Sequence, residues 1–150
     1  MIVSAHRAHK WMRALIQRVK QAAVSVDNKL VGNIEQGLLV FLGVAHADNE
    51  EIANKLLHKI LHYRIFSDEN GKMNRNVQEV QGSLLIVSQF TLMADTQKGL
   101  RPSFTTAAHP EEAKRLYDYF VQQAQHNYDV DKIATGRFAA DMQVSLQNDG

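Results

Sequence analysis

The sequence predicts an α+β fold, in which a mainly antiparallel sheet curls into a barrel and two amphipathic helices cover it. Three observations lead to this prediction. Apolar, β-branched segments recur along the chain, an early turn signal favours antiparallel pairing, and helical periodicity occurs in two places. Two helices are few for a sheet of about seven strands, so we expect the sheet to curl and bury its other face itself.

The first predicted elements are strands. Residues 12–26 alternate β-branched and polar side chains, which is typical of a strand. The turn signal at 27–29 leads into a short partner strand at 30–34. Residues 38–44 are apolar throughout, as expected for a strand that is covered on both faces.

Two later segments have the spacing of helices. Asp48 is the expected N-cap of the first, with Glu51 completing a capping-box-like pair before apolar residues at helical spacing. Pro110 suits the first position of the second helix. The sequence also predicts strands at 64–66, 83–90, 130–134 and 142–146, a turn at 67–74 and an exposed loop at 95–104.

Composition excludes several classes of protein. The chain has 150 residues, of which 45% are hydrophobic and 22% charged, as in one globular domain. Its 17 basic and 16 acidic residues leave a formal charge of +1, which excludes a polycationic nucleic-acid coat. Because the chain has no cysteine, a disulfide framework and a thiolate nucleophile are excluded too. No apolar run approaches the roughly 18 residues of a membrane span.

Residues 1–11 are expected to form an extension outside the domain, which spans 12–150. They carry Arg7 and Lys10 and lack the continuous apolar core of a signal peptide. Met12 offers a second start. We therefore expect the extension to be disordered or to reflect a misassigned start.

The histidines are the first candidates for catalytic or metal-binding residues. His58 and His62 are four apart on the first predicted helix, but no H-E-x-x-H pattern supports a metal site, so a surface position is favoured and no metal is expected. His46, His109 and His126 fall in predicted loops or helix ends. A nucleophile elbow and the glycine loops of Walker and Rossmann type are absent from the sequence.

A polar cluster follows the buried strand at 83–87. Ser88, Gln89, Phe90 and Thr91 place hydroxyls and an amide where the backbone stops pairing, and Leu92 follows them. Such groups can bind a ligand rigidly, because packing fixes the strand behind them. The alternative is a strand that surfaces at a polar end.

The loop after this cluster is basic. Lys98 and Arg101 lie close to Ser103 and Phe104, a combination that suits phosphate binding and base stacking. The alternative is a solvated basic loop.

Together, these motifs closely resemble the D-aminoacyl-tRNA deacylases, formerly called D-tyrosyl-tRNA deacylases. The resemblance runs from Met12 to Gly150. Its motifs are Met12-Arg13-Ala14-Leu15-Ile16-Gln17-Arg18-Val19, residues 37–44, Tyr63-Arg64-Ile65-Phe66, Gly71-Lys72-Met73-Asn74, Ser88-Gln89-Phe90-Thr91-Leu92, Arg101-Pro102-Ser103-Phe104 and residues 135–150.

The resemblance implies a cytoplasmic homodimer with no cofactor and no membrane contact. Its implied partner is the 3′ end of an aminoacyl-tRNA. The implied reaction is hydrolysis of the ester bond that joins a D-amino acid to the tRNA, or glycine to tRNA(Ala) on which it was mischarged. The implied site lies at the subunit interface. Ser88–Leu92 form one wall, and a Gly-Pro pair with a cis bond reaches in from the other subunit and excludes L side chains.

Further roles also follow from the resemblance. Ser88, Gln89, Phe90 and Thr91 are the implied catalytic residues, and Leu92, Met142 and Gly150 the substrate-binding ones. Lys98 and Arg101 are assigned to tRNA phosphate, and Arg18 to support of the Gly-Pro loop. Because no His or Lys near Thr91 in the sequence could activate it, we expect the tRNA 2′-hydroxyl to assist the attacking water.

The chain departs from the family pattern at Gly150, where it ends before the expected proline. From this we formulate an alternative hypothesis, in which the chain is a catalytically impaired protein that binds the tRNA acceptor end.

Backbone N–H groups around Phe90 and Thr91 are the expected oxyanion donors in the active form.

Overall fold

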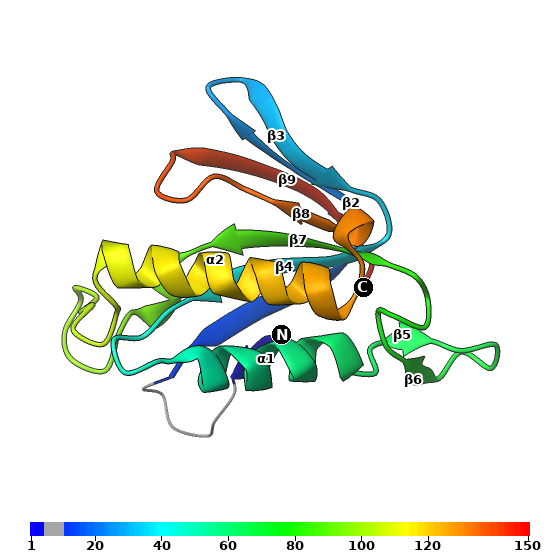
Figure 1. Cartoon of the computed structure of the whole chain (residues 1–150), viewed down its shortest axis with the longest axis horizontal. Coiled ribbons are helices and arrows are strands. Elements are labelled where there is room, and N and C mark those ends of the chain that lie inside the picture. Colours follow the sequence, from blue (N-terminus) through cyan, green and yellow to red (C-terminus); the bar gives the residue numbers. More distant parts are fainter. Residues whose placement is uncertain (5–10) are drawn as a thin grey trace.

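The computed structural model describes residues 1–4 and 11–150, and there it shows two α-helices lying against a mostly antiparallel sheet (Figure 1). The helices are α1 (Glu50–His62) and α2 (Pro110–Asn127), and the 3₁₀ turns are η1 (Phe90–Met93) and η2 (Val130–Lys132). The strands are β1 (Ile2–Ser4), β2 (Arg13–Val26), β3 (Lys29–Ile34), β4 (Gly37–Gly43), β5 (Phe66–Ser67), β6 (Met73–Arg75), β7 (Ser83–Ser88), β8 (Ile133–Thr135) and β9 (Met142–Asn148).

Strand β2 organises the sheet, because its two halves pair with different neighbours. The first half lies between β1 and β4, whereas residues 22–26 lie between β3 and β9, all antiparallel. From β4 the sheet continues through β7 to β8 in parallel. The register of β2 shifts between Val19 and Gln21, so its second half turns over the rest of the sheet (Figure 1).

The α+β prediction with two helices and a mostly antiparallel sheet is confirmed, but the predicted barrel is not. Within the described residues the strand order runs β1-β2-β4-β7-β8 and does not close on itself. The bend in β2 lets the sheet cover its own inner face without a full ring of pairing. Two parallel connections also make the sheet mixed.

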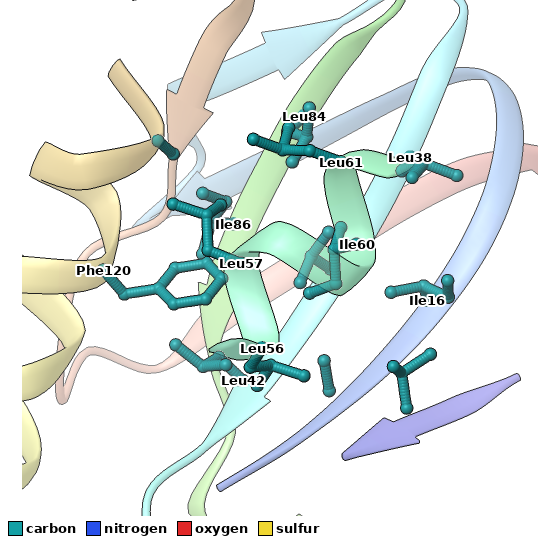
Figure 2. Close-up of a cluster of buried hydrophobic side chains, with 14 of the residues drawn as sticks. Ile16, Leu38, Leu42, Leu56, Leu57, Ile60, Leu61, Leu84, Ile86 and Phe120 are labelled. Carbon is teal, nitrogen blue, oxygen red and sulfur yellow. The ribbon is translucent and has the colours of Figure 1, made fainter. Parts of the chain in front are cut away.

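Alternation along the central strands builds two hydrophobic cores. Leu38, Val40 and Leu42 of β4 point to the helices, whereas Leu39 points into the curl of the sheet. Figure 2 shows the helix-side core, where Phe120 of α2 lies among leucine and isoleucine side chains of α1, β4 and β7. The strand that ends at the polar cluster is therefore fixed from both faces.

The predicted N-terminal extension is partly wrong. Strand β1 pairs with β2, and Val3 in its middle is only 3% exposed. The backbone pairing and the buried Val3 place residues 2–4 in the sheet. Residues 5–10 lie outside the described part of the chain.

The predicted cap of α1 is wrong by one residue. Asn49 is the N-cap, and its Oδ1 accepts a hydrogen bond from the Ile52 N–H at 3.0 Å. Asp48 is buried instead, and its carboxylate accepts the N–H groups of Met12 at 2.8 Å and Ala45 at 2.7 Å. Asp48 therefore links the start of β2 to the β4–α1 loop.

Two predicted strands are shorter than expected. Strand β7 ends at Ser88, and η1 follows from Phe90; strand β8 begins only at Ile133, after η2. The β-branched and aromatic residues of both segments favoured strand locally, whereas the chain has to turn there. No helix in the described ranges is long and apolar enough to cross a membrane.

Candidate functional site

A pocket of about 880 Å³ opens where β7 ends. Ser88, Gln89 and Phe90 line one side, and Met142 at the start of β9 lines another. The remaining lining comes from the β4–α1 loop, the segment before α2, residues 138–141 and side chains of β4, β7, α2 and β9. The structure thus brings four of the predicted site residues to one cavity.

The turn η1 is tightly seated on β4. The Gln89 N–H donates to the Leu42 carbonyl at 2.8 Å. A Cβ at Gly43 would lie 3.0 Å from the Leu92 Cβ and 3.0 Å from the Met93 Sδ. A side chain at this position would push Leu92 and Met93 away, so the glycine at position 43 allows η1 to lie this close to β4.

Two side chains hold the far end of η1. Arg13 Nη1 donates to the Leu92 carbonyl at 3.2 Å, and the Thr106 hydroxyl donates to the Met93 carbonyl at 3.2 Å. The N–H groups at the start of the turn, those of Phe90 and Thr91, have no partner within the turn, as at any helix N-terminus. They lie beside the pocket, because Phe90 lines it.

Thr91 and Leu92 do not line the pocket. The Thr91 side chain is exposed and accepts a hydrogen bond from the Gln89 amide. Leu92 packs toward Gly43. Of the five residues of the predicted cluster, Ser88, Gln89 and Phe90 face the cavity, while the other two shape the turn behind it.

An aromatic pair borders the pocket. Phe90 is 62% exposed, and its ring centroid lies 5.2 Å from that of Phe104 at an interplanar angle of 56°. Both rings line the cavity, so a flat apolar group of a ligand could stack on them.

Lys98 and Arg101 are exposed on the neighbouring loop and do not line the pocket. Paired backbone hydrogen bonds between Asp95 and Ser103 close this loop.

Residues 138–142 form another part of the pocket wall. The segment is anchored to β7, because the Gly136 N–H donates to the Ile86 carbonyl at 3.2 Å. The buried Tyr117 hydroxyl of α2 donates to the same carbonyl at 2.7 Å. Burial, and to a lesser degree the neighbouring Asp118, raises the pKa of the Tyr117 phenol, so this group stays a neutral donor.

Arg18 and Gly150 lie together, away from the pocket lining. The Arg18 guanidinium donates to the carbonyl of Asp149, the residue before Gly150, and to that of Ile65. Gly150 itself stands beside the Arg18 guanidinium, with a φ of +78°. Within one chain, then, the predicted substrate-binding Gly150 does not meet Ser88; the expectation that it serves a second subunit stays a prediction.

Sequence reasoning missed two histidines. His46 and His109 line the pocket, although their positions suggested solvated loops. The pairing of the β4–α1 loop with the segment before α2, through His46 N–H to the Thr106 carbonyl and Ala108 N–H to the Val44 carbonyl, brings them there. No sequence signal reports such a long-range contact.

The other histidine pair is on the surface. His58 and His62 are exposed and stack with ring centroids 4.1 Å apart. Among the described residues no group of three or more His, Cys, Asp or Glu is arranged to hold a metal ion.

Comparisons with known proteins agree on one family. The model of the family described as D-Tyr-tRNA(Tyr) deacylase matches residues 15–150. The D-aminoacyl-tRNA deacylase of Haemophilus ducreyi is 64% identical over 139 residues, which cover 93% of this chain and 94% of the relative. That of Aeromonas hydrophila is 63% identical over the same shares.

Solved structures show the same fold. The c-Myc DNA unwinding element binding protein superposes with a TM-score of 0.88 at 38% identity, covering 91% of this chain and 92% of that one. A probable eukaryotic D-amino acid tRNA deacylase superposes with a TM-score of 0.79 at 18% identity, covering 93% and 95%, and supports the fold alone. With a family model that spans nearly the whole chain and relatives above 60% identity, this chain belongs to the D-aminoacyl-tRNA deacylase family.

Proposed function

We propose that this chain is a hydrolase that cleaves the ester bond between a D-amino acid and the 3′-terminal ribose of a tRNA. Family membership supports the reaction class. The observation that carries the proposal is the pocket at the end of β7, where Ser88, Gln89, Phe90 and Met142 line one cavity of about 880 Å³. A cavity of this size suits a small, largely enclosed ligand.

In this proposal the aromatic pair holds the terminal base. Phe90 and Phe104 present ring faces at the pocket border, and unpaired bases at RNA ends are commonly stacked on such rings. The Ser88 hydroxyl and Gln89 amide then lie beside the ribose and its ester. Lys98 and Arg101, exposed on the loop that leads to Phe104, bind phosphates farther along the tRNA.

The chemistry in this proposal uses the 2′-hydroxyl of the substrate to orient the attacking water. The described residues give Thr91 no imidazole partner; its hydroxyl is bonded to the Gln89 amide instead. An unassisted threonine is a weak nucleophile. The protein contributes position and the free N–H groups of Phe90 and Thr91, which stabilise the negative charge that develops on the ester oxygen.

Chiral selection is proposed to come from a second subunit. In a homodimer, the segment around Gly150 of one protomer closes the pocket of the other and excludes L side chains, while glycine on tRNA(Ala) still fits. In the described part of the chain β9 pairs with β2 alone, and Leu146 on β9 is 38% exposed, which supports a partner along this face. The cysteine-free composition suits the cytoplasm.

The test is ester hydrolysis with matched substrates. The purified protein is incubated with D-tyrosyl-tRNA, L-tyrosyl-tRNA and glycyl-tRNA(Ala), and both ester loss and tRNA binding are measured. Loss of the D-tyrosyl and glycyl esters with retention of the L-tyrosyl ester supports the proposal. Binding without ester loss supports the acceptor-end binder instead, and equal loss of the D and L esters contradicts chiral selection.

A further inference from the structure

A second hollow adjoins the pocket. It is a groove of about 610 Å³ between α2 and the chain that follows β8. One wall is a stripe of α2, and the other is residues 135–138. Phe138 lines both the groove and the pocket, so it forms the partition between them.

The two walls of this groove are fixed to each other. The Ile86 carbonyl accepts hydrogen bonds from the Tyr117 hydroxyl on the α2 side and from the Gly136 N–H on the other. The ring centroids of Tyr117 and Phe138 are 5.8 Å apart across the floor. A Cβ at Gly136 would lie 2.6 Å from the Met142 Sδ, so this segment also sits tightly on the wall of the pocket.

The groove carries polar groups that suit RNA. Arg137 is exposed, and its side chain has no hydrogen-bond or ion-pair partner in the described part of the chain. Lys114, by contrast, is paired with Asp118 along α2. Gln122 and Gln125 add amide groups to the same wall. A guanidinium recognises phosphate by charge and geometry, and amides recognise base edges.

We propose that this groove binds the nucleotides that precede the terminal nucleoside of the tRNA, with Arg137 on a phosphodiester. This inference rests on the proposed function, because it assumes that the terminal nucleoside and its ester occupy the pocket. The RNA strand must then leave the pocket along the protein surface. The groove beyond Phe138 offers a preformed path, whereas the loop with Lys98 and Arg101 is positioned to meet more distant phosphates.

The experiment compares a long and a minimal substrate. Arg137→Gln, Arg137→Lys and the control Lys72→Gln, in the exposed turn between β5 and β6, are assayed on D-tyrosyl-tRNA and on 3′-O-D-tyrosyl-adenosine, which has no phosphate. For Arg137→Gln we expect KM on the tRNA to rise about tenfold with kcat unchanged, as for one lost charge-assisted contact. The adenosine ester should be cleaved as by the wild type, and Arg137→Lys should recover most of the affinity.

Two kinetic outcomes contradict the proposal that the groove binds RNA. Equal losses on both substrates mean that Arg137 acts on the pocket through Phe138, and no loss on either means that the RNA takes another path. A direct binding measurement keeps the test independent of catalysis. With uncharged tRNA, Arg137→Gln should weaken binding about tenfold and flatten its salt dependence. This result is expected even if the wild type cleaves neither ester, in which case the proposed function fails but the groove proposal does not. Unchanged tRNA binding refutes the groove in either case.

Discussion

The Arg18 guanidinium donates two hydrogen bonds to one carbonyl, that of Asp149, at 2.9 Å from Nε and 2.7 Å from Nη2. The two residues are 131 positions apart in the sequence. A third bond, from Nη1 to the Ile65 carbonyl at 2.5 Å, ties the same side chain to the segment before β5. Arg18 therefore fixes the chain next to Gly150 on the rigid strand β2.

We predict that Arg18→Lys is not a conservative change. A lysine ammonium cannot span both carbonyls as the planar guanidinium does. The variant should lose about 1–3 kcal/mol in the free energy of unfolding, measured by urea denaturation. It should also discriminate less between D- and L-tyrosyl-tRNA if the segment around Gly150 selects the substrate. Arg75→Lys, at an exposed ion pair, is the control and should change neither quantity.

Gly43→Ala tests whether the close packing of η1 on β4 matters for activity. The new methyl group meets Leu92 and Met93 at 3.0 Å, so η1 must move away from β4. We expect kcat for D-tyrosyl-tRNA to fall at least tenfold and the protein to lose about 1–3 kcal/mol of stability. Gly71→Ala separates the two effects. It strains a positive φ of +75° in open space, so it should lower stability and leave kcat unchanged.

Thr91→Ala tests the assignment of the nucleophile. The Thr91 hydroxyl is outside the pocket lining and bonded to Gln89, so its loss should lower kcat by less than about tenfold in steady-state deacylation. A fall of more than about 10⁴-fold, the size expected when a true nucleophile is removed, contradicts water attack assisted by the substrate.

Asp48 gives a pH dependence that stability measurements can follow. Burial raises the pKa of its carboxyl above 3.8, against the opposing effect of the bonds from Ala45 and Met12. The folded state thus holds this proton at pH values where the unfolded chain releases it, so this group's contribution to stability declines as pH rises through the interval above 3.8. Asp48→Asn removes this pH-dependent contribution, because an amide does not titrate.

We expect Asp48→Asn to be about 1–3 kcal/mol less stable than the wild type at pH 7, because one amide oxygen cannot replace both carboxylate oxygens. The difference should widen as the pH is lowered toward 4, in urea denaturation at a series of pH values. A difference that narrows instead shows that the two N–H bonds outweigh burial and lower the pKa.

The sequence predicted the parts of the molecule that rest on local pattern. The apolar run that ends at Ser88 and the resemblance in residues 135–150 led us to expect Ser88 and Met142 at one site. Both residues line the same pocket, and their role in substrate binding stays a prediction. The amphipathic spacing around Phe120 likewise identified the helix that covers the sheet.

What the sequence could not predict depends on contacts between distant segments. His46 reaches the pocket only because its loop pairs with the segment before α2. Asp48 resembled a cap in the sequence, but its partner Met12 lies 36 residues away and draws it inside. The barrel prediction was wrong for a similar reason. The apolar alternation of β2 slips around Val19, where the register shifts, but this local pattern does not determine whether the strands close into a ring.

The Ile86 carbonyl accepts from both α2 and the chain after β8, through Tyr117 and Gly136. Displacing either α2 or the chain after β8 therefore costs a hydrogen bond to the same carbonyl of β7. A ligand that binds in the pocket or in the groove should stabilise these contacts and slow amide hydrogen exchange at Gly136. One backbone oxygen of β7 thus helps to hold a wall of the pocket and both walls of the groove in place.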